Sequence, residues 1–213
     1  MTFFYDPDVY RPLNRFLRLS DIRPYSVLFV GSVSESAASN RKTLIERISK
    51  YFRVHVMTFK NPRLEGVTWH RASNRPWIVN WHFNRAHLVL NIEDVGETYA
   101  PENQNRLHDT RIVPYRDQKV FHGNHIFPAM GAGRVCLSES SFELERFCRD
   151  KANLLTWRDA DESVEKVRWS IAHPEEMAAI RMNALKTARE NHTAAIRLRE
   201  LFSLSGIGAE LSL

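Results

Sequence analysis

One stretch of the chain strongly limits what it can fold into: a short apolar segment ending in glycine, then an amphipathic segment, then a second apolar segment. Residues 26–31 (SVLFVG) have the length and apolar character of a buried strand. Residues 53–58 (RVHVMT) alternate in polarity, which is typical of a second strand. Between them, four apolar residues recur at helical spacing: Leu44, Ile45, Ile48 and Phe52. A strand, a helix and a strand in this order favour a parallel sheet with a right-handed crossover.

The same alternation continues toward the C-terminus. We expect further strands over residues 87–92, 111–115, 134–137 and 153–156. We expect further helices over residues 74–86, 124–131 and 141–149. In the last part of the chain, Pro174 suits the first position of a helix, and Thr193 could cap the final one. The pattern predicts an α/β fold: a single Rossmann-like, doubly wound parallel sheet with C-terminal helices.

The 213 residues suit one domain with terminal extensions. Residues 1–25 are punctuated by three prolines and show no periodic pattern, so we expect an arm or linker there. We place the Rossmann-like domain over residues 26–205 and a C-terminal tail over residues 206–213. A polar segment from residue 93 to about 109 is long for a connection in an α/β fold, which favours a functional loop.

Composition narrows the class of protein less than the pattern does. The formal net charge of +5 is compatible with an anionic partner such as a nucleotide diphosphate, a nucleic acid or a membrane surface. No apolar run approaches the ~20 residues that span a bilayer, and the N-terminus lacks the basic region of a signal peptide. Two cysteines do not make a disulfide framework. We therefore expect a cytoplasmic protein with reduced thiols and no membrane span.

The loop after the first strand is the first part of a candidate binding site, because doubly wound sheets bind ligands beyond the carboxyl ends of their strands. Gly31 and Ser32 begin this loop, and Arg41 and Lys42 stand at the start of the helix that follows. Backbone N–H groups at a helix start attract phosphate, and two cations strengthen the attraction. A P-loop is excluded, because Arg41 stands where that motif needs a glycine before the lysine. The alternative is a solvated loop with two surface cations.

Two further parts of the chain complete the candidate site. Asn91 ends another expected strand, and Gly123, Asn124 and His125 begin a helix that offers backbone amides and a titratable ring. The alternative here is an ordinary asparagine cap. His122 and His125 have a spacing seen in zinc sites, but no cysteine or carboxylate cluster accompanies them nearby. We therefore expect no metal and no cofactor.

Two other motifs favour structural roles. Gly131 and Gly133 follow an expected helix and precede a strand, an order that indicates a helix end with a tight turn rather than a dinucleotide fingerprint. The tryptophans at positions 69, 77 and 81, among several arginines, suggest stacking on nucleic-acid bases. The apolar spacing from Trp77 to Phe83 fits packing in the core, and we favour that interpretation.

Several segments, in order along the chain, share one resemblance. They are YDP and YRP in residues 5–12, SVLFVGS in residues 26–32, FNRAHLVLNI in residues 83–92, FPAMGAG in residues 127–133, and NHT in residues 191–193 with Arg197. Together they resemble the linker and the C-terminal domain of GT-B glycosyltransferases of the group 1, family-four-like superfamily, most of all its CgeB-like members. The resemblance covers roughly residues 5–203.

This resemblance implies a function. In that family the C-terminal domain binds a nucleotide-sugar donor, the N-terminal domain binds the acceptor, and sugar transfer occurs in the cleft between them. The chain begins near the linker, so we expect a separate acceptor-domain subunit, or a homo-oligomer, to complete the cleft. The resemblance assigns no catalytic base.

Three positions depart from the family's pattern. The glutamate that often holds the donor ribose corresponds to Pro128, a nearby arginine corresponds to His125, and an upstream carboxylate falls near Val120. Because a charge-assisted hydrogen bond contributes about 1.5–3 kcal/mol, its loss predicts weaker donor binding.

Three hypotheses for the function follow. The first is sugar transfer from a nucleotide-sugar donor by a two-part enzyme. The second is a non-catalytic glycosyltransferase-like interaction or regulatory module. Nucleic-acid binding or modification is third, because no basic helix or nucleic-acid motif is present.

Overall fold

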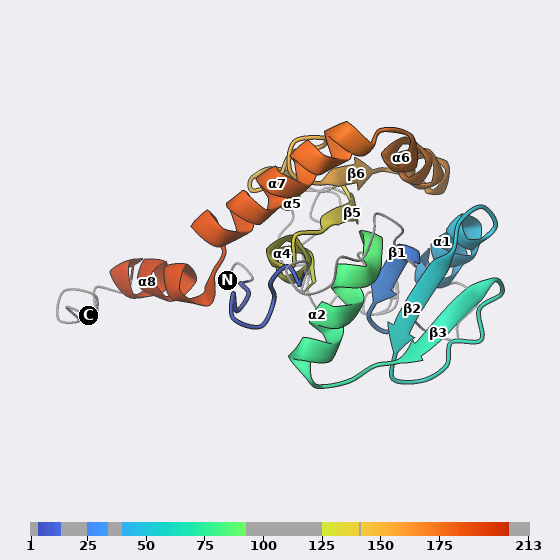
Figure 1. Cartoon of the computed structure of the whole chain (residues 1–213), viewed down its shortest axis with the longest axis horizontal. Helices are drawn as coiled ribbons and strands as arrows, with labels where there is room; N and C mark the ends of the chain where they lie inside the picture. The colour runs from blue at the N-terminus through green and yellow to red at the C-terminus, as the bar shows by residue number, and fades with distance from the viewer. Residues whose placement is uncertain (1–3, 14–24, 34–39, 93–124, 141, 205–213) are drawn as a thin grey trace, which may run out of the picture.

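The computed structural model describes residues 4–13, 25–33, 40–92, 125–140 and 142–204. Its strands are β1 (Tyr25–Val30), β2 (Val54–Thr58), β3 (Val67–Arg71), β4 (Ala86–Asn91), β5 (Val135–Glu139) and β6 (Leu155–Trp157). They form one parallel sheet in the order β3-β2-β1-β4-β5-β6 (Figure 1). The chain builds outward from β1 to β3, returns to place β4 beside β1, and then builds outward in the other direction. This topology confirms the predicted doubly wound α/β fold.

Helices cover both faces of the sheet. The helices of the described residues are α1 (Asn40–Ser49), α2 (Pro76–Arg85), α4 (Ile126–Gly131), α5 (Phe142–Glu145), α6 (Ala160–Ala172), α7 (Pro174–Asn191) and α8 (Ala194–Leu204). The apolar residues of α1 and α6 pack into one core, and those of α2 and α4 pack into the other. Successive residues of β1 enter the two cores in turn, because neighbouring side chains of a strand point to opposite faces. Both faces of β1 are therefore buried, which explains its almost uninterrupted apolar sequence.

The structure differs from the sequence prediction at an edge strand and at a short helix. β3 was not predicted, because this strand lies at the edge of the sheet and most of its side chains are exposed or half-buried. The helix expected over residues 141–149 is the shorter α5. After it the chain turns, and the backbone N–H of Arg149 donates to Oδ1 of Asn153 at 2.8 Å. The strand and the long loop expected between residues 93 and 115 lie outside the described residues.

The expectation that Trp77 and Trp81 pack in the core is wrong. Their side chains are 60% and 40% exposed, whereas Phe83 on the same helix is fully buried. Helix α2 turns Val79 and Phe83 toward the sheet, and its spacing leaves the two tryptophans on the outer side. Trp69, on β3, is also 37% exposed.

Residues 4–13 lie against the domain. The backbone N–H of Tyr5 donates to the carbonyl of His192 at 3.0 Å, and the carbonyl of Tyr5 accepts from Ala194 at 3.0 Å. The ring of Tyr5 lies directly over Gly131, where an added Cβ would come within 2.2 Å of it. Gly133 follows with a φ of +70°, as the predicted tight turn after a helix requires. Both glycines are therefore structural.

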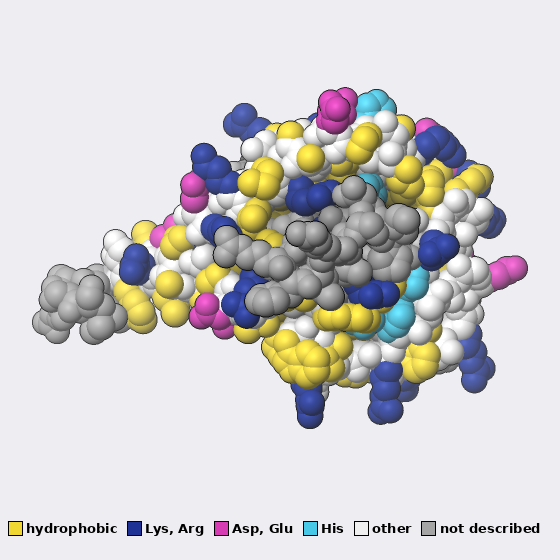
Figure 2. All heavy atoms as spheres, in the orientation of Figure 1, with side chains coloured by type: hydrophobic (Ala, Val, Ile, Leu, Met, Phe, Trp, Pro, Cys, Tyr) yellow, Lys and Arg dark blue, Asp and Glu magenta, His cyan; other side chains and the backbone are white. Residues whose placement is uncertain are grey.

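The C-terminal helices begin as the sequence predicts. Pro174 opens α7, and the hydroxyl of Thr193 caps α8 by accepting from the backbone N–H of Ile196 at 3.3 Å. His192, between these helices, is 1% exposed and stacks on Phe127 with ring centroids 3.6 Å apart. Helix α8 has no buried residue and projects from the body of the domain (Figures 1 and 2). Within the described part of the chain, no helix is long and apolar enough to cross a membrane.

Candidate functional site

The sheet contains one point at which a ligand site is expected from its topology. β1 and β4 are neighbours, but the chain leaves β1 toward β2 and leaves β4 toward β5. Because the connections diverge, a crevice is expected beyond the carboxyl ends of these two strands, and doubly wound proteins bind ligands there. The loop after β1, the start of α1 and the residues after β4 border this switch point.

Arg41 connects the two loops at the switch point. Its Nη1 donates to the carbonyl and the hydroxyl oxygen of Ser32, both at 3.1 Å. Its Nε and Nη2 donate to the carbonyl of Ile92 at 3.3 and 3.1 Å. These bonds fix the orientation of the guanidinium at the first turn of α1, where the positive end of the helix dipole favours an anion.

The backbone at Gly31 allows the loop to turn toward Arg41. Its φ of +153° is one that residues with a side chain rarely adopt. An added Cβ would lie 3.1 Å from the ring of Phe29, and the Arg41 guanidinium lies 5.9 Å from the centroid of that same ring. A larger residue at position 31 would therefore disturb the ring beneath the cation.

Asn91 and Ser138 connect the ends of β4 and β5. The two residues are paired in the sheet register, and Nδ2 of Asn91 donates to the hydroxyl of Ser138 at 3.1 Å. Ser138 is fully buried, and its hydroxyl donates in turn to the carbonyl of Glu139 at 3.2 Å. These bonds hold the Asn91 side chain at the carboxyl ends of β4 and β5.

His125 lies near Arg41. Burial, and then the positive charge of Arg41, lower the pKa of His125 below its ordinary value of 6.5. The imidazole is therefore neutral at pH 7, and a neutral imidazole has one N–H donor and one acceptor nitrogen. Its ring lies edge-on to Phe83 with centroids 6.2 Å apart, and its side chain makes no capping bond to α4.

The structure therefore gathers most of the residues predicted from the sequence. Gly31, Ser32, Arg41 and Asn91 border the switch point, and the charge of Arg41 contributes to the lowered pKa of His125. Lys42 follows Arg41 in the first turn of α1 and is half-buried. The predicted positions 123 and 124 (Gly123 and Asn124) lie outside the described residues. Ser138 was missed because the predicted strand ended at Leu137, whereas β5 continues to Glu139.

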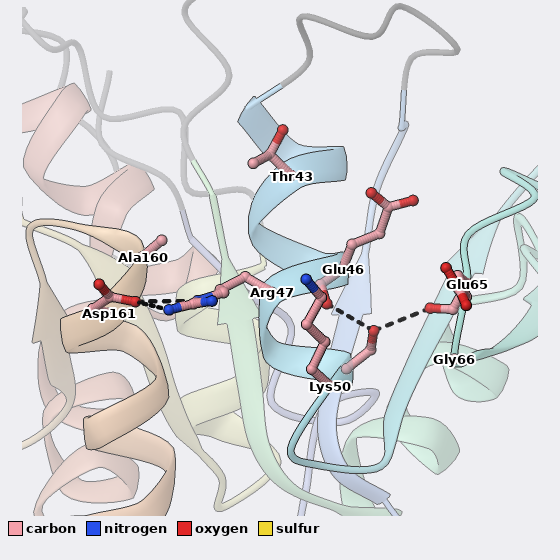
Figure 3. A pocket seen from close by; sticks show the side chains of 9 residues that line it. Thr43, Glu46, Arg47, Lys50, Glu65, Gly66, Ala160 and Asp161 are labelled. Atoms are coloured by element: carbon pink, nitrogen blue, oxygen red, sulfur yellow. Dashed lines mark hydrogen bonds and ion pairs between the residues drawn. The ribbon is translucent and has the colours of Figure 1, made fainter.

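A larger hollow, of about 620 Å³, lies elsewhere, between α1, the segment before β3 and the start of α6 (Figure 3). None of the candidate residues lines it. Within it, Arg47 pairs with Asp161 at 2.6 Å, and the hydroxyl of Ser49 donates to the carbonyls of Glu46 and Glu65.

Metal-ligating groups are not clustered in the part of the chain that the structure describes. There, no group of three or more histidine, cysteine, aspartate or glutamate side chains is arranged to hold a metal ion. Cys136 and Cys148 are both free and buried, and burial raises the pKa of each thiol.

Comparison with protein families gives the decisive observation. The glycosyl transferase-like family matches residues 41–203, well over half of the chain. The chain belongs to this family. The match includes α1, the carboxyl ends of β4 and β5, and α4, so it spans most of the switch-point residues of this glycosyl transferase-like domain. A comparison with curated protein sequences found no significant match.

Solved structures share the fold of the glycosyl transferase-like domain. Sucrose-phosphate synthase from Thermosynechococcus elongatus superposes with a TM-score of 0.65 at 10% identity, over 98% of this chain and 52% of that one. HepE from Anabaena, solved with UDP and glucose, gives 0.62 at 14% identity, over 95% and 55%. The C-terminal domain of a group 1 family glycosyl transferase (LpcC) from Francisella tularensis gives 0.58 at 10% identity, over 89% and 99%.

The chain thus has the fold of one half of a GT-B glycosyltransferase, as the sequence resemblance implied. It spans about half the length of the first two of these proteins and nearly all of the isolated C-terminal domain. At identities of 10–14%, the likeness concerns the fold.

Proposed function

We propose that this glycosyl transferase-like domain binds a nucleoside-diphosphate sugar at the switch point between β1 and β4. It would then act as the donor-binding half of a two-part glycosyltransferase. The observation that carries the proposal is the Arg41 guanidinium, held between Ser32 and Ile92. HepE, which shares the fold, was solved with UDP and with UDP-glucose, which supports the choice of ligand class.

The chemistry of the site suits a departing diphosphate. In the proposed transfer, an acceptor hydroxyl oxygen bonds to the anomeric carbon and the bond from that carbon to the diphosphate oxygen breaks. The electron pair leaves on the nucleotide, and the hydroxyl proton passes to water or to the departing phosphate. Negative charge therefore grows on the diphosphate, and preorganised donors lower its energy. The proposal assigns this role to Arg41, the start of α1 and the N–H of His125 rather than to a metal ion or a cofactor.

The ribose is expected to be held weakly. Pro128 is buried in α4, its carbonyl accepts from Ala132 at 2.9 Å, and its side chain has no hydrogen-bonding atom. Losing one charge-assisted hydrogen bond of about 1.5–3 kcal/mol corresponds to about 10- to 150-fold weaker binding. We therefore expect donor affinities between high micromolar and millimolar.

The acceptor half is proposed to come from another chain or from a second copy of this one. Proteins of the same fold that contain both halves are nearly twice as long as this chain. Co-purification from the native source, followed by a transfer assay with and without the recovered partner, tests this part of the proposal. Full activity of the isolated chain as a monomer would contradict it.

Isothermal titration with UDP, GDP and UDP-glucose tests donor binding. We expect at least one of them to bind at millimolar concentration or below, and Arg41→Ala to weaken that binding at least tenfold. Arg47→Ala is the matched control, because Arg47 lies on the same helix but pairs with Asp161 outside the switch point. No binding of any of the three nucleotides at millimolar concentration would refute the proposal.

A second candidate is a glycosyltransferase-like module that has lost catalysis and serves an interaction or regulatory role. The proline at position 128, where the family has a ribose-binding glutamate, favours it. The two candidates differ in turnover. A module without catalysis would not consume a nucleotide sugar in the presence of its partner, whether or not it binds the nucleotide.

A further inference from the structure

A second recessed surface lies between residues 8–13 and the first turns of α2. We call it the tryptophan groove, after Trp77 and Trp81, which line it together with Asp8 and Arg11. Its volume is about 340 Å³. The two indoles are 60% and 40% exposed, and Figure 2 shows apolar side chains gathered over the start of α2. Neither the predicted site nor the proposed donor chemistry uses this surface.

Hydrogen bonds from buried polar side chains hold the wall of the tryptophan groove in place. The carbonyl of Arg11 accepts from the side-chain amides of Asn80 and Asn84 at 3.2 and 3.1 Å. Oδ1 of Asn84 accepts from the backbone N–H of Leu13 at 2.9 Å and from Nη2 of Arg134 at 3.2 Å. Arg134 is 1% exposed and Asn84 is 8% exposed. Buried polar groups thus fix residues 11–13 against α2, and the groove keeps its shape.

We propose that the tryptophan groove binds an oligosaccharide and adds to the acceptor-binding surface of the partner half; the acceptor role rests on the function proposed above. A pyranose ring has a face of C–H bonds and a rim of hydroxyl groups. An exposed indole offers a flat apolar face, and Asp8 and Arg11 offer a charged acceptor and donors for the hydroxyls. Trp77 and Trp81 are four residues apart on α2, so their Cβ atoms lie about 5–6 Å apart, comparable to the repeat of sugar rings in a chain.

The size of the groove favours a saccharide over a protein partner. Small-ligand pockets enclose about 300–1,000 Å³, and the groove falls within this range. An aromatic side chain offers about 150–250 Å² of surface, so the exposed parts of the two indoles together amount to roughly 150–250 Å². A stable protein interface buries about 800 Å² on each partner. The two tryptophans therefore supply too little apolar area for a protein and enough for one or two sugar rings.

The position of the groove connects it to the donor site. Phe83, on α2, contacts Tyr10 with ring centroids 6.0 Å apart and contacts His125 with centroids 6.2 Å apart. Tyr10 lies between residues 9 and 11, which line the groove, and His125 is one of the predicted donor-site residues. One buried aromatic ring thus contacts both a neighbour of the groove and a residue of the predicted donor site.

The test is retention of the full chain on a printed array of diverse oligosaccharides, followed by calorimetric titration of the best-retained saccharide. We expect wild-type protein to be retained, and the double variant Trp77→Ala, Trp81→Ala to bind at least tenfold more weakly. Phe59→Ala is the matched control, because Phe59 is 67% exposed but lies outside the groove. Melting curves check folding, and the double variant with phenylalanine at both positions should recover part of the binding.

Each outcome separates the inference from the proposed function. If no saccharide retains the wild-type protein more strongly than it retains the alanine double variant, the groove proposal is overturned. An oligomeric wild type that the same double variant converts to a monomer, without saccharide binding, overturns it in favour of a protein interface. Saccharide binding that depends on the tryptophans, in a chain that binds none of UDP, GDP and UDP-glucose by calorimetry, supports the groove and refutes the donor site. Unchanged UDP-glucose binding by the double variant supports two separate subsites.

Discussion

Replacing Arg41 by lysine separates the geometry of the switch point from its charge. Lysine keeps the positive charge, but its ammonium is a compact group without the planar fork of donors that arginine has. Arg41 bonds to Ser32 on one loop and to Ile92 on the other, through different nitrogen atoms of that fork. An ammonium can hold one of the two loops at a time. The variant therefore disconnects the loops while leaving a cation in place.

The expected loss follows from the bonds that lysine cannot make. A hydrogen bond to a charged group contributes about 1.5–3 kcal/mol. Arg41 is only half-buried, so solvent screening reduces the expected loss to about 1–2 kcal/mol. In a domain of this size, 1 kcal/mol lowers the melting temperature by about 2–4 °C, which gives a fall of about 2–8 °C. If the donor binds between the two loops, the same energy raises the dissociation constant for UDP about 5- to 30-fold.

The assay compares Arg41→Lys with Arg47→Lys by thermal melting and by calorimetric titration of UDP. Arg47 lies on the same helix, its substitution changes the same atoms, and it pairs with Asp161 on an exposed surface. We expect Arg47→Lys to match wild type in both measurements. If the two variants melt together and bind UDP equally, Arg41 does not organise the switch point and the reasoning is refuted.

Three other substitutions test the structure. Gly31→Ala forces an unfavourable φ and places a Cβ 3.1 Å from the ring of Phe29, so urea unfolding should show a loss of about 1–3 kcal/mol; an unchanged midpoint would contradict the backbone described here. Gly131→Ala places a Cβ 2.2 Å from the ring of Tyr5 and should cost about 1–3 kcal/mol; adding Tyr5→Leu should recover part of the loss, and no recovery would place the clash elsewhere. Burial, and then a neighbouring arginine, lower the pKa of His192 from 6.5 to about 3, so the unfolded chain binds the proton first as pH falls. Stability should therefore decline between about pH 6.5 and 3, and His192→Gln should reduce that slope by up to about 1.4 kcal/mol per pH unit; identical slopes would exclude this assignment.

Much of the fold was predictable because its signals are local. Apolar periodicity located β1, β2, β4 and β5, and the boundaries in the structure differ from the predicted ones by one or two residues. Edge strand β3 escaped because all of its side chains are exposed or half-buried, so it lacks the buried apolar run that marks the other strands. The candidate site was located by a topological rule rather than by a motif. The rule pointed to the carboxyl ends of β1 and β4, where we propose the site, but it did not identify Ser138, which depended on the exact end of β5.

The sequence by itself determined the α/β class and the parallel order of the strands. Each of these depends on the length and period of apolar segments, which a chain carries without reference to its neighbours. Only the tertiary structure decided that Arg41 spans 51 residues to hold Ile92, and that Trp77 and Trp81 face outward while Phe83 is buried. The positions of neighbouring elements in space decide which distant segments touch and which face of a helix is covered. No local pattern encodes those positions.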